Sequence, residues 1–351
     1  MTALTARTPQ DRRDWQACAG IKERLYPDLP GIQEEAREES RRLQRLSRRD
    51  SFRRLRVFLA WRGEEPVGRI AAIADARHRP GDEGFFGFFE CENDPEAAGA
   101  LLAASARQLK AWGKKSMLGP ISASTNEKVG ILIEGFDTWP HPNLAYNPPY
   151  YRDLLTGCGL EKAMGLLSYL WTRDLPVPER MALLKERALR RRRVELHFPA
   201  LDPRPEEAVI LRDVYNESLQ NNWGFVPLSF AEAKDILRWY RHSGQPELLL
   251  RLDVEGEPAG TCFLQPNPRA GFNPSVPPLR AAVLGLRPKF RNQGLSAVLI
   301  DRAMELAQAK GYHRAEVSLI MENNVTVRRL VEHTLGCPVL HRYEVYRTEI
   351  T

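Results

Sequence analysis

The sequence predicts the same order of helices and strands twice, and this repetition restricts the fold more than any other feature. Each half combines helices, a β-hairpin and then strands that alternate with helices. The two hairpin turns share a phrase, which reads RGEEPVG at 62–68 and EGEPAG at 255–260. A repeat of this length indicates a duplicated domain and not a solenoid of short repeats.

The expected elements follow from hydrophobic periodicity and from Gly and Pro positions. The first half is expected to contain two helices within 8–48, a hairpin of 57–61 and 67–72, a strand at 84–90, a helix at 95–112, a strand at 117–119, loops around a short helix at 120–150, and a strand at 160–172. The second half is expected to contain a strand at 194–198, helices at 206–220 and 229–242, a hairpin of 247–252 and 260–264, a strand at 281–286, a helix at 295–310, a strand at 316–320, a helix at 325–334 and a strand at 339–348.

This alternation predicts an α/β protein of two tandem domains, each with a mixed, mostly antiparallel sheet flanked by helices. The length of 351 residues suits two domains. The stretch 177–192 has a proline as its second residue and is rich in Leu and Arg. It predicts a helical linker between a first domain at 1–176 and a second domain at 193–351.

Composition excludes several classes of protein. The five cysteines lie far apart without a CxxC pair, and the seven histidines show no metal-binding spacing, so neither a disulfide framework nor a metal site is expected. Apolar runs are too short to span a bilayer, and the N-terminal charges precede no apolar core. We therefore expect a cytoplasmic protein.

Basic residues are clustered although the net charge is only +6. Eight arginines lie between Arg41 and Arg56, and four more form the run 190–193. Such runs attract nucleic acid, anionic lipid or phosphorylated cofactors, whereas the interleaved glutamates favour solvated helix faces. Both interpretations stay open at this point.

The segment LGLRPKFRNQGLS at 284–296 is the motif that carries chemistry. A strand is expected to end at Leu286, and a helix to begin at Gly294 after a tight turn. The first amides of a helix are unpaired and carry partial positive charge. Gly294 allows an anion to approach the backbone, and Arg291 adds a full charge. Together they predict a cradle for a pyrophosphate group.

This RxxGxS turn resembles the RxxGxG/A acyl-CoA loop of the GNAT acetyltransferase superfamily. The strand at 316–320 and Asn324 before the next helix extend the resemblance. It implies an acyl-CoA donor whose acyl group is attacked directly by an amine, without a covalent enzyme intermediate. It also implies a set of acyl-CoA contacts, which comprises Leu284, Leu286, Arg291, Asn292, Gln293, Gly294, Leu295, Ser296 and Asn324.

The sequence departs from the family at the residue that protonates the leaving thiolate. Many GNAT members carry a tyrosine there, but the matching position in this chain is Val331. Tyr343 is the substitute that we name as the acid, although Tyr346 and His333 remain alternatives. For the base, we name Glu217 or a bound water.

The phrase NNWGFVPLS at 221–229 lies between two predicted helices of the second half. In GNAT-like folds this connection covers the acceptor side of the cleft. Asn222, Trp223 and Phe225 are therefore expected to contact the acceptor. The alternative is a packed turn in which Trp223 fills the core.

The first half lacks the phosphate loop. After GFFGFFE the sequence reads CENDPEAAGALLAA, in which Glu92 and Asp94 would repel a pyrophosphate. This half therefore resembles a degenerate GNAT domain that no longer binds CoA. Its segments GPISASTNE at 119–127 and NPPYY at 147–151 either contact the acceptor or only form turns.

Over nearly its whole length the chain resembles a group of bacterial tandem GNAT proteins that includes ceramide synthases. The marks are VGRIAA at 67–72, GFFGFFE at 84–90, and Asn216 followed by NNWGFVP. The resemblance implies an N-acyltransferase acting on a long-chain sphingoid base, with contact between basic stretches and anionic lipid headgroups of the inner membrane. The alternatives are an acetyltransferase of small amines, a Fem-like transferase that uses aminoacyl-tRNA, and a CoA sensor without activity. Nucleic acid is not expected as a partner.

Overall fold

The computed structural model describes residues 3–48, 50–199 and 204–350. The chain divides into two compact units, which are described separately below. Unit 1 comprises Met1–Leu166 and His341–Thr351, and unit 2 comprises Leu167–Leu340. Arg49, a member of the first arginine cluster, lies outside the described residues.

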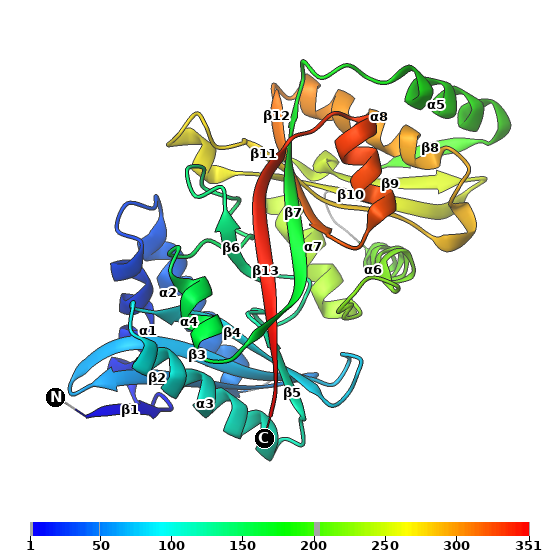
Figure 1. Cartoon of the computed structure of the whole chain (residues 1–351). Helices are drawn as coiled ribbons and strands as arrows, with labels where there is room; N and C mark the ends of the chain where they lie inside the picture. Colours follow the sequence, from blue (N-terminus) through cyan, green and yellow to red (C-terminus); the bar gives the residue numbers. More distant parts are fainter. Residues whose placement is uncertain (1–2, 49, 200–203, 351) are drawn as a thin grey trace. The chain divides into compact units, whose positions relative to one another are not determined.

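Unit 1 is a sheet with helices against it (Figure 1). Its strand order is β1-β2-β3-β4-β5-β13, and β6 pairs with β13. The pairing is antiparallel except between β4 and β5. The elements are β1 (Leu4–Arg7), α1 (Arg12–Leu25), α2 (Ile32–Arg48), β2 (Arg53–Arg62), β3 (Glu65–Asp75), β4 (Glu83–Cys91), α3 (Pro95–Ala111), β5 (Ser116–Gly119), β6 (Ile131–Glu134), α4 (Tyr151–Gly157), and β13 (Val339–Glu349), which enters the unit at His341.

Unit 2 repeats the arrangement, with the strand order β8-β9-β10-β11-β12 and β7 beside β12. Helices α6 and α7 cover one face of this sheet, and α8 with α5 covers the other (Figure 1). The elements are β7 (Glu161–Thr172), which enters the unit at Leu167, α5 (Glu179–Arg191), β8 (Val194–His197), α6 (Pro205–Leu219), α7 (Phe230–His242), β9 (Leu249–Val254), β10 (Glu257–Pro266), β11 (Leu279–Leu286), α8 (Leu295–Ala309), β12 (Arg314–Met321) and α9 (Val325–Arg329), which continues as a π-helical turn, Leu330–Thr334.

The predicted α/β class and the repeated order of elements are confirmed. In each unit the one parallel pair between neighbouring strands has three register positions. Glu83–Phe85 pairs with Ser116–Leu118 in unit 1, and Leu279–Ala281 pairs with Ala315–Val317 in unit 2. Strands β1 and β6 were not predicted, because β1 reads LTAR without an apolar run and β6 lies within a stretch rich in Pro, Asn, Ser and Gly.

The predicted domain boundaries differ from the units. The stretch 177–192 is no free linker, because Met181 and Ala188 of α5 are buried in the core of unit 2. The C-terminal strand belongs to unit 1 from His341, where it pairs with β5 and β6 and buries Tyr346 in the core. Hydrophobic periodicity identifies a strand, but it does not say which sheet the strand joins.

The described residues were also searched for membrane-spanning helices and for groups of metal-binding side chains. No helix within them is long and apolar enough to cross a membrane. Nor do any three of their His, Cys, Asp or Glu side chains group in a way that could hold a metal ion.

Candidate functional site

One edge of β11 becomes free part of the way along the strand. On one side β11 pairs with β10 as far as Leu286. On the other side it pairs with β12 only at Leu279–Ala281. The backbone groups of 282–286 that face β12 are therefore available to an extended ligand, as they are at an exposed sheet edge.

A β-bulge explains why the two strands separate. Phe263 of β10 pairs with Val283, but the next residue, Leu264, pairs with Ala281. Ala282 is thus an extra residue in β11. Bulges bend a strand and increase its local twist, which directs the rest of β11 away from β12. Leu284, within this free part, is 40% exposed.

The turn after β11 leads directly to the N-terminus of α8. Asn292 and Gly294 both have left-handed backbone conformations, with φ values of 60° and 79°. Gly294 is the N-cap residue, and no side chain from the described part of the chain caps the helix there. Among the described residues, no side chain accepts from the amides of Leu295 and Ser296, which keep their partial positive charge, whereas the amide of Ala297 donates to the carbonyl of Gly294 at 3.0 Å. This is the local chemistry that binds a phosphate oxygen.

Arg291, which was predicted to contact the pyrophosphate, forms two hydrogen bonds to backbone carbonyls. Its Nε donates to the carbonyl oxygen of Leu286 at 3.1 Å, and its Nη2 donates to that of Ser218 at 2.8 Å. The guanidinium thus ties the turn to the end of β11 and to α6. Its charge contributes to the local field, but its donors on these two nitrogens are directed at protein carbonyls.

Glu217, the predicted base, forms a bidentate ion pair with Arg287. Arg287 Nε and Nη2 each donate to one carboxylate oxygen of Glu217 at 2.8 Å. Hydrogen bonding to Glu217, opposed by burial, raises the pKa of Arg287. Because both oxygens of Glu217 accept from a permanent cation, the geometry favours a positioning role over proton abstraction.

The remaining predicted residues have clear structural roles. Tyr343 lies in the part of β13 that belongs to unit 1, and its side chain is 1% exposed. Asn324 is the N-cap of α9, where its side chain accepts from the amide of Val327. Gln293 donates to the carbonyl of Lys289, Leu295 is buried, and Ser296 is half-buried in the first turn of α8.

The predicted acceptor segment begins beside β11. The amide of Asn222 donates to the carbonyl of Leu219, the last residue of α6. That end of α6 packs so closely on β11 that a Cβ added at Gly285 would lie 2.7 Å from the Ser218 Cβ. Trp223 is half-buried, whereas Phe225 packs against the core of unit 2. The structure thus brings this segment, β11 and the turn at 287–294 together.

Two polar groups near Val331 were missed in the sequence. Tyr169 of β7 is fully buried and donates to Glu332, which also accepts from Arg328 at 3.0 Å. Burial and the hydrogen bond to Glu332 raise the pKa of Tyr169 to about 12. No sequence signal could have found this pair, because 163 positions separate the two residues.

This site belongs to the segment that matches a known family. Residues 210–337 match the Acetyltransferase (GNAT) family. The segment 210–337 is therefore a GNAT acetyltransferase domain. Enzymes of this family transfer an acyl group from acyl-CoA to an amine.

Similar proteins match the chain over most or all of its length. It is 26% identical to the bacterial ceramide synthase of Caulobacter vibrioides, over 84% of this chain and 82% of that protein. It is also 26% identical to Protein YghO of Escherichia coli, over 98% of this chain and 95% of that protein. A tandem GNAT protein from the clavulanic acid biosynthesis pathway has the same fold, with 13% identity, 100% and 99% coverage and a TM-score of 0.61.

In unit 1, the strand edge that corresponds to the free edge of β11 is occupied by the unit's own chain. Beyond its parallel pair with β5, strand β4 bonds to the chain that follows β5. The amide of Ile121 donates to the carbonyl of Phe86 at 2.7 Å, and the amide of Phe88 donates to Ser122 Oγ at 3.2 Å. These bonds occupy the backbone groups that an extended ligand would need.

The helix after β4 is also closed to an anion. Asp94 is the N-cap residue of α3, and its carboxylate accepts from the amides of Glu96 and Ala97 at 3.0 and 3.1 Å. Arg62 neutralises this carboxylate at 2.6 Å. The prediction that unit 1 does not bind CoA thus gains a structural argument and stays a prediction.

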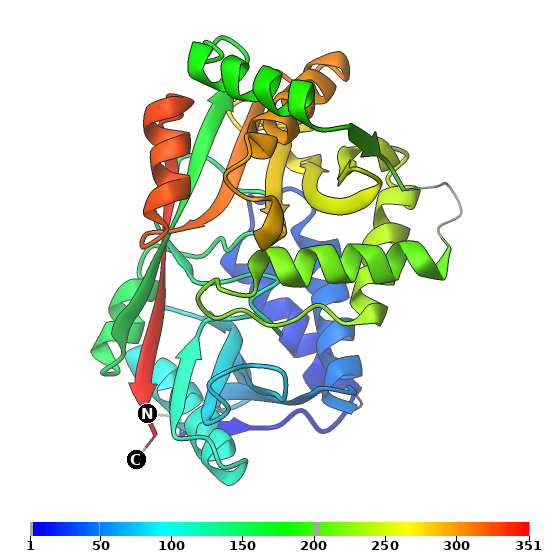
Figure 2. The same cartoon turned by 90° about the vertical axis from the view of Figure 1, so that its right-hand side faces the viewer.

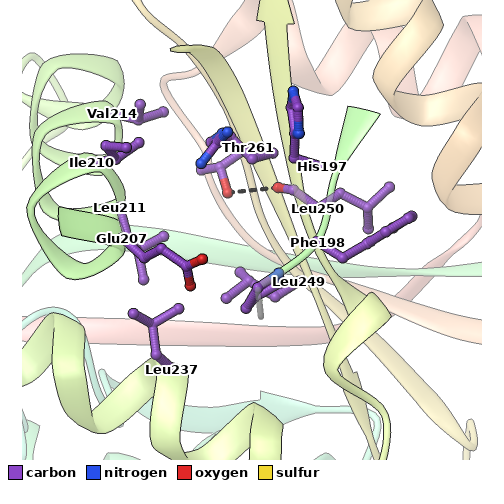
Figure 3. A pocket seen from close by; sticks show the side chains of 12 residues that line it. His197, Phe198, Glu207, Ile210, Leu211, Val214, Leu237, Leu249, Leu250 and Thr261 are labelled. Atoms are coloured by element: carbon purple, nitrogen blue, oxygen red, sulfur yellow. Dashed lines mark hydrogen bonds between the residues drawn. The ribbon is translucent and has the colours of Figure 1, made fainter. Parts of the chain in front are cut away.

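A pocket opens on the α6 face of unit 2 (Figure 3). Its empty space of about 380 Å³ includes the part that is open to solvent. Thr261 donates to the carbonyl of Leu250 at 2.8 Å, so its hydroxyl is already paired. Polar groups at the pocket come from His197, Glu207 and Arg251. The apolar lining includes Ile210, Leu211, Val214, Leu237 and Leu249.

Proposed function

We propose that the protein transfers an acyl group from acyl-CoA to the primary amine of a long-chain acceptor of the sphingoid type. In this proposal the free edge of β11 pairs with the amide-containing arm of the donor. The amides of the turn and of the first residues of α8, at 293–296, bind its pyrophosphate group. The acceptor approaches beneath the segment 221–225.

The observation that carries this proposal is that a free strand edge and an uncapped helix N-terminus follow each other along one stretch of chain. The free edge of 282–286 ends where the turn begins, and the turn ends at the uncapped N-terminus of α8. One extended ligand with amides followed by a diphosphate would satisfy both sets of backbone groups. Unit 1 provides the internal contrast, because Ile121, Ser122 and Asp94 occupy the matching groups there.

The chemistry needs a neutral amine at the thioester carbon. An alkyl ammonium has a pKa of about 10.4, so a water molecule must accept its proton before attack. The nitrogen then forms a bond to the carbonyl carbon and gives up a second proton to water, the carbon–sulfur bond breaks, and the CoA thiolate leaves and takes up a proton from water. Alignment of the two reactants and backbone amides near the carbonyl oxygen supply the acceleration.

The pocket on α6 supports a long-chain substrate. Ser218, near the end of α6, packs on β11, and Ile210 lies eight residues earlier on the same helix, about 12 Å along its axis. A hydrocarbon chain that starts at β11 and follows α6 would reach an apolar pocket. The name of the Caulobacter relative, a ceramide synthase, agrees with such a substrate.

A binding experiment tests the donor site. Ser296→Asp places a carboxylate in the first turn of α8, where it favours the helix but repels a phosphate. We expect calorimetric titration with CoA to show an affinity loss of about tenfold or more, with an unchanged melting temperature. The matched control is Asp94→Asn in unit 1, which should leave the affinity unchanged. Equal affinity of wild type and Ser296→Asp would refute the donor site.

An activity panel tests the acceptor. Thiol release would be measured with acetyl-, octanoyl- and palmitoyl-CoA, each with sphinganine, spermidine and an amino acid as the amine. The proposal expects the highest kcat/KM with sphinganine. Turnover restricted to acetyl-CoA and a small amine would instead support the alternative of a small-molecule acetyltransferase.

A further inference from the structure

Helix α5 presents exposed leucines and unpaired arginines together. Leu183 and Leu184 are 47% and 38% exposed. The opposite face of the helix is anchored, since Met181 and Ala188 are 3% and 2% exposed in the core of unit 2. Lys185 adds a bond to Asp301 of α8 at 2.7 Å. The leucines therefore stay outside because the buried side of α5 is already occupied.

The charges around these leucines are strongly one-sided. Residues 179–193 contain seven Lys or Arg and two Glu. Glu186 lies near Arg190 at 3.5 Å, and Arg193 bonds Glu195 at 2.6 Å. Among the described residues, no ion pair joins an acid to Arg180, Arg187, Arg191 or Arg192, and all four are exposed.

The exposed side of α5 has the arrangement of an interfacial helix. Leu183, Arg187 and Arg190 recur at spacings of four and three, so they share the face opposite Met181 and Ala188. Arginines on both sides of exposed leucines suit the boundary between headgroups and acyl chains. A nucleic acid or a free phosphate would use the arginines but not the leucines. The leucines therefore favour a lipid surface as the occupant.

We propose that the outer face of α5, defined by Leu183, Arg187 and Arg190 and flanked by Leu184 and Arg191, docks unit 2 on an anionic lipid bilayer. The inference concerns a binding surface and does not depend on acyl transfer. Helix α5 runs beside α8 (Figures 1 and 2), and its Leu184 carbonyl would lie 2.6 Å from a Cβ built at Gly294. Docking of α5 would therefore hold the turn that precedes α8 near the membrane surface.

Vesicle co-sedimentation without CoA or acceptor tests this surface. The probes are vesicles of phosphatidylcholine alone and vesicles that also contain phosphatidylglycerol. We expect wild-type protein to partition onto the anionic vesicles, with a partition coefficient that falls as salt is added. Failure of the wild-type protein to bind anionic vesicles would overturn the proposal.

Two matched pairs of variants distinguish a specific contribution of α5 to vesicle binding from the effects of net charge and of exposed apolar side chains in general. Arg187→Glu with Arg191→Glu should lower the partition coefficient by about tenfold or more. Arg41→Glu with Arg45→Glu on α2 makes the same charge change at the same spacing, but Leu43 there is fully buried, and we expect less than about a twofold effect.

The apolar pair uses single substitutions. Leu183→Ser should lower the partition coefficient by about tenfold. Trp239→Ser, at a 42% exposed position on α7 across the sheet, should leave it unchanged. Equal losses in the α5 and α2 charge variants would mean that net charge alone drives binding, which overturns the proposal. So would RNA binding that depends on Arg187 and Arg191 while vesicle binding does not.

Discussion

Arg287 donates to both carboxylate oxygens of Glu217, from Nε and from Nη2, each at 2.8 Å. A third nitrogen, Nη1, donates to Glu257 and to the carbonyl of Pro258 at 3.0 and 2.9 Å. Arg287 is the first residue after β11, so this network attaches the start of the phosphate turn to α6 and to β10. Glu217, which was predicted to be the base, therefore helps to hold the backbone around the proposed donor site.

Glu217→Gln tests that positioning role. Because the amide keeps one hydrogen bond to Arg287, we expect kcat to fall by less than about tenfold and the pH profile of kcat/KM to keep its shape. A general base at this position would instead cost about 10²–10⁴ in kcat and remove the acidic limb. Arg287→Met should raise KM for acyl-CoA, and the double variant should show non-additive losses.

Gly294→Ala is expected to destabilise unit 2 and weaken CoA binding. The φ of 79° disfavours any side chain, and the new Cβ would lie 2.6 Å from the Leu184 carbonyl, so α5 must shift. We expect a loss of about 2–4 kcal/mol in the free energy of unfolding. Gly311→Ala is the matched control, since it has a φ of 80° with no atom within 4 Å. If urea titrations showed equal losses in the free energy of unfolding for both variants, the contact between the new Cβ and the Leu184 carbonyl of α5 would not contribute to the destabilisation.

Ile210→Trp tests the role of the pocket in chain-length selection. The indole would fill apolar space beside α6, where Ile210 is half-buried. We expect kcat/KM for long-chain substrates to fall by about tenfold or more, with little change for short ones. Val209→Trp, at an exposed neighbouring position outside the pocket, should preserve the length profile. A uniform loss for all lengths in Ile210→Trp would contradict a chain-binding pocket.

The lowered pKa of Glu39 predicts how the stability of unit 1 depends on pH. Burial alone would raise the pKa of Glu39, but the charges of Lys22, Arg69 and Lys128 lower it to about 2. Its unfolded value is about 4.3, so the carboxylate stabilises the unit above that pH, and the stabilisation is lost as pH falls towards 2.

We therefore expect Glu39→Gln to lower the free energy of unfolding by roughly 3 kcal/mol at neutral pH, because two buried cations lose a partner. The variant should also lose stability less steeply than wild type between about pH 5 and pH 2. Glu38→Gln, at the exposed neighbouring position, should match wild type in chemical denaturation at each pH.

Local chemistry in the sequence was enough to predict the turn that we propose as the donor site. A strand end, Gly294 and the start of a helix occur within a few residues, so their geometry follows from neighbouring backbone preferences. The same reasoning identified Asp94 and the absence of a phosphate turn in the first half. It assigned Arg291 to the phosphate, however, because sequence spacing does not reveal the carbonyl of Ser218 as a competing acceptor.

The sequence alone determined the duplication, the order of the elements and the position of the phosphate turn, since each depends on residues that are close along the chain. Only the tertiary structure decided that Arg287 engages Glu217, that Ile121 and Ser122 close unit 1, and that the last strand belongs to the first unit. These are contacts between distant segments. Their partners are selected by packing and by competition for hydrogen bonds, which no local pattern of residues records.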